Sequence, residues 1–96
     1  MLPSPEKEKI ELQHLIDNCL QIMSPIFKKE NVMLNNTMLQ NFKVNIDQHQ
    51  MEQVLINLLT NAVVALENLE QKQIFISAEA NENRVFIKIS EKLLVF

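Results

Sequence analysis

The sequence predicts an α+β domain built as a two-layer α/β sandwich, with two main helices packed on one face of a mixed or antiparallel sheet. Three observations predict this class. Apolar residues recur at helical spacing over two long segments. Short runs in which apolar and polar residues alternate lie between and after these segments, and the last two form a hairpin pattern. The length of 96 residues and the hydrophobic content of 47% suit one globular domain.

The N-terminal part combines a polar lead-in with the first helix. Residues 1–9 contain two prolines and mixed charge, so we expect them to be solvated and the domain to span residues 10–96. The helix is expected over 10–30, with Pro25 kinking or splitting it near Met23, because proline lacks the N–H that a helix interior needs. Its core stripe is predicted to comprise Leu12, Leu15, Ile16, Cys19, Met23, Ile26 and Phe27.

Two short strands and a long helix are expected next. Residues 32–34 are a short apolar run, 35–37 is turn-like, and 42–46 alternates apolar and polar residues. The long helix spans 47–67, with Asp47 as a suitable N-cap. At about 100° per residue, its core stripe is predicted to comprise Met51, Val54, Leu55, Leu58, Leu59, Ala62, Ala65, Leu66 and Leu69.

A hairpin is predicted near the C-terminus, with strands over 73–80 and 84–90 joined by a turn at 81–83. Three interpretations stay open for the apolar residues 93–96 that follow: an extension of the last strand, a surface that pairs with another chain, or the remainder of a longer domain. The inward faces of the two strands are expected to carry Ile74, Ile76, Ala78, Val85, Ile87 and Ile89.

The composition argues against several functions. A net charge of −3 gives no reason to expect nucleic acid as a partner. No apolar run approaches the ~20 residues of a membrane span, and the start of the chain lacks the apolar core of a signal peptide, so we expect a cytoplasmic chain. The single cysteine, Cys19, has no partner for an internal disulfide and is interpreted as a small core residue. Glycine is absent, which excludes a glycine-rich phosphate loop.

Asn57 and Asn61 are the most informative residues of the long helix. They lie one turn apart at the margin of its apolar stripe, and Gln50, Val64 and Asn68 share that flank. Asparagine is a mediocre helix former, and its amide oxygen suits a hard cation such as Mg²⁺. Periodicity alone leaves two interpretations open: a polar surface edge or a magnesium–nucleotide site.

The segment around these asparagines resembles a known motif. Over residues 53–66 it reads QVLINLLTNAVVAL, which is similar to the N box of bacterial sensor histidine kinases. Their ATP-binding domain shares the Bergerat-type fold with gyrase, heat-shock chaperones and mismatch-repair ATPases. The preceding Asp47 and the order of helix, strand and turn also fit. The resemblance covers roughly residues 10–90 and implies a partial fold of this type.

The resemblance implies roles for three residues. In the family, the residue matching Asn61 ligates the Mg²⁺ bound to the ATP phosphates, and the residue matching Asn57 faces the phosphates. Glu91 stands where the family has an aspartate that accepts a hydrogen bond from the adenine amino group. After it, Lys92 begins a run that differs from the family's Asn-Gly-x-Gly turn. ATP and Mg²⁺ are the implied cofactors, and no catalytic residue is assigned.

We therefore expect a truncated ATP-binding domain of a two-component sensor histidine kinase, a transferase that when intact moves a phosphoryl group from ATP to histidine. The implied partners are a domain that carries the histidine phosphoacceptor and dimerises, and a response regulator. The chain alone is expected to bind ATP weakly or not at all and to be inactive. Two alternatives stay open. One is a non-enzymatic interaction module that uses the half-fold and the exposed C-terminal strand, through which it could also form a homodimer. The other is a gene fragment without a selected function.

Three further polar residues are interpreted as ordinary surface groups. In the family, the phosphoacceptor histidine is followed by an acidic residue, whereas His14 is followed by Leu15. His49 belongs to the first turn of the long helix and is expected to face solvent. Glu52 lies at a different helical position from the glutamate that related ATPases use as a general base, so we expect a solvated charge. Two distant histidines and one cysteine do not favour a zinc site.

Overall fold

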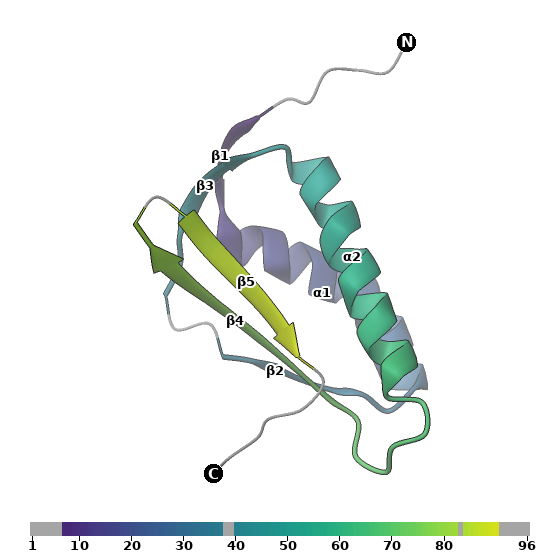
Figure 1. The fold of residues 1–96 in the computed structure, drawn as a ribbon. Coiled ribbons are helices and arrows are strands. Elements are labelled where there is room, and N and C mark those ends of the chain that lie inside the picture. The colour runs from purple at the N-terminus through teal and green to yellow at the C-terminus, as the bar shows by residue number, and fades with distance from the viewer. Residues whose placement is uncertain (1–6, 38–39, 83, 91–96) are drawn as a thin grey trace.

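The computed structural model describes residues 7–37, 40–82 and 84–90. Figure 1 shows both helices on the same side of the larger sheet, so the prediction of a two-layer α+β arrangement is confirmed. In chain order, the elements are β1 Glu8–Glu11, α1 Leu12–Lys29, β2 Met33–Asn36, β3 Lys43–Ile46, α2 Gln48–Ala65, β4 Gln73–Asn81 and β5 Arg84–Ser90.

The strands form two groups. The larger sheet has the order β2-β4-β5, with β2 parallel to β4 and β4 antiparallel to β5. The predicted hairpin is therefore confirmed, and Ala78 lies opposite Ile87 in its register. β1 and β3 form a separate antiparallel ribbon in which Ile10 lies opposite Val44. The mixed sheet that the sequence predicts is present. Of the two short strands predicted before the long helix, β2 belongs to this sheet, whereas β3 pairs with β1 outside it.

The strand β1 corrects the expectation for the N-terminal part of the chain. Glu8 and Lys9, which were expected in the solvated lead-in, pair with β3, and Ile10 is buried in that ribbon instead of starting the helix. Residues 8–11 contain one apolar residue among charged ones, so their sequence lacks the alternation of apolar and polar residues that predicts a strand. Pairing with a distant segment decided the conformation, which is the usual limit of local propensity.

The helix α1 is continuous from Leu12 to Lys29, so of the two predicted effects of Pro25, a kink or a split near Met23, the split does not occur. Pro25 lies within the helix and is exposed to solvent. The backbone carbonyl one turn before Pro25 has no helical N–H donor, but it can bond to water instead. The missing hydrogen bond therefore costs less free energy than it would in a buried helix. Six of the seven predicted stripe residues are buried, and Ile26 near the helix end is 41% exposed.

The end of α1 has the hydrogen bonds of a Schellman motif. The N–H of Val32 donates to the carbonyl of Phe27 at 2.8 Å, and the N–H of Asn31 donates to the carbonyl of Lys28 at 3.3 Å. Asn31 has a φ of 57°, the left-handed conformation that this motif requires. Phe27 and Val32 are both buried, so the chain leaves the helix directly into the core.

Strand β2 is longer than the sequence predicts. Asn35 and Asn36, expected as part of a turn, pair in parallel with Phe75 and Ile76 of β4. The side-chain amide of Asn35 donates to Oε1 of Gln73 at 3.3 Å, so a neighbouring strand satisfies a side chain that otherwise favours turns. Tertiary pairing overrides the local turn preference here.

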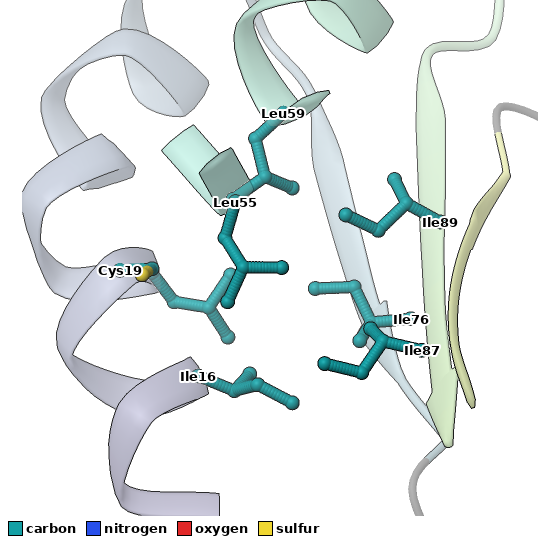
Figure 2. Close-up of a pocket in the computed structure, with 8 residues that line it drawn as sticks. Ile16, Cys19, Leu55, Leu59, Ile76, Ile87 and Ile89 are labelled. Carbon is teal, nitrogen blue, oxygen red and sulfur yellow. The ribbon is translucent and has the colours of Figure 1, made fainter. Parts of the chain in front are cut away.

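The core lies between the two helices and the β2-β4-β5 sheet. Figure 2 shows side chains of α1 and α2 pointing toward isoleucines of β4 and β5 around a cavity of about 10 Å³. Every lining residue is apolar, and the cavity has room for about one water at most, so it offers no ligand site. The lining residues are Ile16, Cys19, Leu20, Leu55, Leu59, Ile76, Ile87 and Ile89.

Candidate functional site

The helix α2 begins with the predicted cap. The N–H of Gln50 donates to Oδ1 of Asp47 at 3.0 Å, which satisfies one of the free donors of the first turn. The helix continues to Ala65, and Leu66 is its C-cap. Its buried side is formed by Leu55, Leu59, Ala62, Val63 and Leu66.

The buried side of α2 is rotated relative to the prediction. Val54 and Leu58, both expected in the core, are 49% and 47% exposed, whereas Val63, which is outside the predicted stripe, is buried. Packing against α1 explains the rotation, since Thr60 Oγ1 lies 3.9 Å from Met23 Sδ. The side of α2 toward α1 is therefore covered, and the opposite side faces solvent. Ala65 and Leu69, also expected in the core, are exposed as well.

This open side carries both asparagines. Gln50, Val54, Asn57 and Asn61 follow each other at spacings of four, three and four residues, so they form one row along the helix. All four are exposed. The structure thus brings Asn57 and Asn61 together, one turn apart on an accessible surface, as the sequence predicts.

A hollow of about 250 Å³ adjoins the first turns of this row. It lies between the end of the β1–β3 ribbon and the start of α2. Lys7 contributes the one cationic side chain of its lining, and sequence reasoning missed this residue because it sits in the expected lead-in. No sequence signal could have found it, since only the pairing of β1 with β3 brings it beside α2. The lining residues are Lys7, Asn45, Ile46, Asp47, Gln50, Met51 and Val54.

The other candidate residues lie away from the row or outside the described residues. Glu91, the expected adenine contact, is outside them. His14 on α1 and His49 on α2 are exposed. Glu52 is half-buried and accepts a hydrogen bond from Nε2 of Gln48 at 3.0 Å, so it is less solvated than expected. The described structure does not bring these residues into one site.

Cys19 is buried where the two helices meet. Its thiol donates to the backbone carbonyl of Glu52 at 3.9 Å. Burial, with a further contribution from the negative charge of Glu52, raises the pKa of Cys19 to about 11. The thiol is therefore protonated at neutral pH and acts as a core residue, because the thiolate is the reactive form. Within the described part of the chain, no three His, Cys, Asp or Glu residues gather to hold a metal ion.

Two bacterial proteins resemble the chain in sequence. It is 32% identical over 95 residues to a putative NtrY-like sensor histidine kinase of Rickettsia bellii, a match that covers 92% of the chain. It is 29% identical over 93 residues to the protein of the same description from Rickettsia felis, covering 90% of the chain. The chain spans 14% of the length of each relative. No family model matches the sequence.

Solved histidine kinase structures share the fold. The catalytic domain of histidine kinase ThkA superposes with a TM-score of 0.78 and 27% identity, covering 88% of the chain and 58% of that structure. Histidine kinase AdeS of Acinetobacter baumannii gives a TM-score of 0.76 at 21% identity, covering 91% of the chain and 42% of AdeS. A complex of ThkA with the response regulator TrrA also matches, with a TM-score of 0.74 and 27% identity over 86% of the chain and 25% of that kinase.

The fold shared with the solved ThkA structures defines the class of the protein as part of a histidine kinase catalytic domain. Taken with the sequence similarity, the chain belongs to the sensor histidine kinases of two-component signalling. In the described residues, neither helix combines the length and the apolar character that crossing a membrane requires.

Proposed function

We propose that α2 forms the metal-binding side of a histidine kinase ATP site, with Asn57 and Asn61 directed at the Mg²⁺ and phosphates of ATP. The observation that carries this proposal is the row of exposed residues along α2, which presents the two amides one turn apart. The fold implies ATP as the ligand. The hollow beside Lys7 lies at the N-terminal end of the row, and its lining contains one basic residue, Lys7, and one acidic residue, Asp47.

The chemistry of the two asparagines fits Mg²⁺ as a shared ligand of protein and nucleotide. Amide oxygens are hard ligands, and Mg²⁺ takes few of them while it keeps phosphates and water for its remaining positions. Two neutral amides carry no charge to hold the ion by themselves. Asn61 would hold the ion together with the phosphates, and Asn57 would contact the phosphates beside it. When bound, the metal would neutralise charge on the transferred phosphoryl group.

The chain by itself is proposed to bind Mg·ATP weakly and to transfer no phosphate. Asn57 and Asn61 lie on an open surface, so solvent screens whatever charge they contact. Glu91 is proposed to contribute little to adenine recognition, because its side chain is one methylene longer than the aspartate of the family and glycines do not follow it.

NMR titration of the labelled chain with Mg·ATP tests the assignment. We expect weak shifts that begin at the side-chain amides of Asn57 and Asn61, reach half saturation at millimolar or higher concentration, and disappear in Asn61→Ala. Gln21→Ala, an exposed amide removed from α1, serves as the matched control and should leave the shifts intact. Shifts elsewhere, or none at all, would reject the assignment to α2, and a micromolar Kd by calorimetry would reject the weak binding.

In the intact kinase, the proposed reaction moves the γ-phosphoryl group of ATP to a histidine on a separate dimerisation domain. Positioning and metal electrostatics dominate this kind of transfer. A response regulator is the proposed downstream partner, and the complex of ThkA with TrrA supports that partner class. We propose that the domain extends over residues 8–96, two residues earlier than the sequence predicts, because β1 pairs with β3 from Glu8 onward.

A second candidate function is protein interaction without catalysis. The exposed apolar residues Val54 and Leu58 favour it, since they form an unpartnered strip on the helix layer. The expected contribution of residues 93–96 lies outside the described residues. A defined dimer in size-exclusion chromatography favours this function, and a monomer argues against it.

A further inference from the structure

The start of α1 is capped by residues that are distant in the sequence. The N–H of Gln13 donates to Oδ1 of Asn41 at 3.0 Å, and the N–H of Leu12 donates to the backbone carbonyl of Phe42 at 2.7 Å. Glu11, at the N-cap position itself, makes no side-chain capping bond. The first N–H groups of a helix have no acceptor within that helix. The cap of α1 is therefore supplied by the segment just before β3.

The start of α2 is capped from the other end of β3. The N–H of Gln50 donates to Oδ1 of Asp47 at 3.0 Å, and the N–H of Met51 donates to the backbone carbonyl of Asp47 at 3.1 Å. In Figure 1, β1 leads directly into α1 and β3 leads into α2. Since Asn41 and Asp47 flank β3, one strand carries the acceptors for the first turns of both helices.

The β1–β3 ribbon is weakly anchored to the rest of the fold. Among the described strands it forms a separate two-stranded sheet. Of its residues, Ile10 alone is buried, whereas Val44 and Ile46 are partly buried against the core. An isolated pair of strands is marginally stable in water. We therefore expect the ribbon to open at a lower free energy than the core.

We propose that the β1–β3 ribbon is a conformational coupler, which makes the first turns of α1 and α2 open and close as one unit while the core stays folded. When β3 separates from β1, Asn41 and Asp47 move with it, so both helices lose hydrogen-bond acceptors in the same event. A change in β1 is thereby transmitted to the start of α2, across a chain separation of more than thirty residues.

This coupling regulates the N-terminal end of the candidate site. Gln50 begins the exposed row on α2, and Lys7, the residue before β1, lines the same hollow as Gln50. Opening of the ribbon displaces Lys7 and loosens the turn that carries Gln50. Asn57 and Asn61 lie about two and three turns further along the helix. The inference gives these asparagines no role, so it does not depend on nucleotide binding.

Two independent caps are the alternative to a coupler. Asn41 and Asp47 are separated by six residues, which span roughly 20 Å when extended. Sites more than about 10 Å apart that share no partner act independently on stability. Independent caps predict that the loss of one cap loosens its own helix alone. A coupler predicts that the loss of either cap loosens the first turns of both helices.

Amide hydrogen exchange of the labelled 96-residue chain, measured by NMR, tests the coupling. Asn41→Ala removes the side-chain cap of α1. It should accelerate exchange at Gln50 and Met51 of α2 about fivefold, the ratio expected for the loss of a typical cap. Ile10→Val weakens the ribbon from β1 by removing one buried methyl group. It should accelerate the same two α2 amides by a similar factor.

The reverse experiment starts from α2. Asp47→Ala removes the side-chain acceptor of α2 and should accelerate exchange at Leu12 and Gln13 of α1, because a coupling between two sites is reciprocal. If exchange at these α1 amides stays unchanged while the first turn of α2 is loosened, the two caps are independent and the proposal is wrong.

Asn31→Ala is the matched control, because it makes the same substitution at the opposite end of α1, outside the ribbon. It should leave the exchange of Gln50 and Met51 within about twofold of the unmodified chain. Equal acceleration in this control would assign their exchange to global unfolding and overturn the proposal. So would acceleration confined to α1 in Asn41→Ala, or unprotected amides at both helix starts in the unmodified chain. Circular dichroism confirms that each variant is folded.

Discussion

The two helices have the same length of 18 residues and different relations to the core. α1 buries a regular stripe and exposes mostly polar residues on its other sides. α2 buries the side around Leu55 and Leu59, but it also exposes Val54 and Leu58 next to Asn57 and Asn61. α1 confines its buried residues to one stripe, whereas α2 divides its apolar residues between the core and an outward-facing row.

The difference shows what helical periodicity can decide. In α1, the apolar residues occupy one stripe, so the helix has one way to pack. In α2, apolar residues occur on nearly every side, so periodicity marks a broad sector without locating its centre. The position of α1 then selects the side that becomes buried.

The largest expected difference in stability is between alanine substitutions of two neighbouring leucines on opposite sides of α2. Leu59 is 1% exposed and Leu58 is 47% exposed. Leu59→Ala should lower the free energy of unfolding by about 3 kcal/mol, because it leaves a cavity in the core. Leu58→Ala should change it by less than about 0.5 kcal/mol. Urea denaturation at low protein concentration measures both, and equal losses would contradict the rotated orientation of α2.

The junction between the helices should respond to alkaline pH through Cys19. The folded state raises the pKa of Cys19 to about 11 from an ordinary value of 9.0. The unfolded thiol ionises first, so its contribution to stability is complete below pH 9 and is lost as the pH rises toward 11. The free energy of unfolding should fall by at most about 1 kcal/mol per pH unit in this window, most steeply near pH 10.

Cys19→Ala is the control for this pH dependence. Urea titrations of both chains between pH 9 and pH 11 should show a steeper loss in the unmodified chain. Identical slopes would mean that other groups cause the loss and that the thiol is not held protonated by the fold.

The end of α1 can be tested at Asn31, where the backbone is left-handed. Asn31→Ala should cost about 1 kcal/mol, because a Cβ without a polar group is disfavoured in this conformation. Asn31→Gly should keep or raise the stability, since glycine is the commonest residue at this position of the motif. Thermal melts of the two variants measure the difference, and a melting temperature lower in the glycine variant would contradict the role of the left-handed residue.

The start of α2 offers the smallest of these effects. Asp47→Ala removes the acceptor for the N–H of Gln50 and should cost about 1 kcal/mol or less. Asp47→Ser keeps a capping oxygen and should recover most of the loss. Chemical denaturation of the pair measures the cap, and equal stability of the alanine and serine variants would show that the hydrogen bond contributes little.

Sequence reasoning located most elements but missed those that depend on distant partners. The hairpin and both helices follow local patterns that need no tertiary information. β1 around Ile10 and the second half of β2 at Asn35 do not, since one lacks alternation and the other consists of turn-forming residues. Both became strands because another segment supplied their hydrogen bonds.

For the candidate site, the sequence by itself determined that Asn57 and Asn61 lie on one side of a helix. The residues QVLINLLTNAVVAL specify a helix, place Asn57 and Asn61 one turn apart, and resemble the N box. Only the tertiary structure decided which side of that helix faces solvent, because apolar residues occur on most of its sides and only those that contact α1 or the sheet become buried. It also brought Lys7 beside α2 through strand pairing across the chain. Residue spacing along a helix is a local property, whereas burial depends on which other segments pack against it.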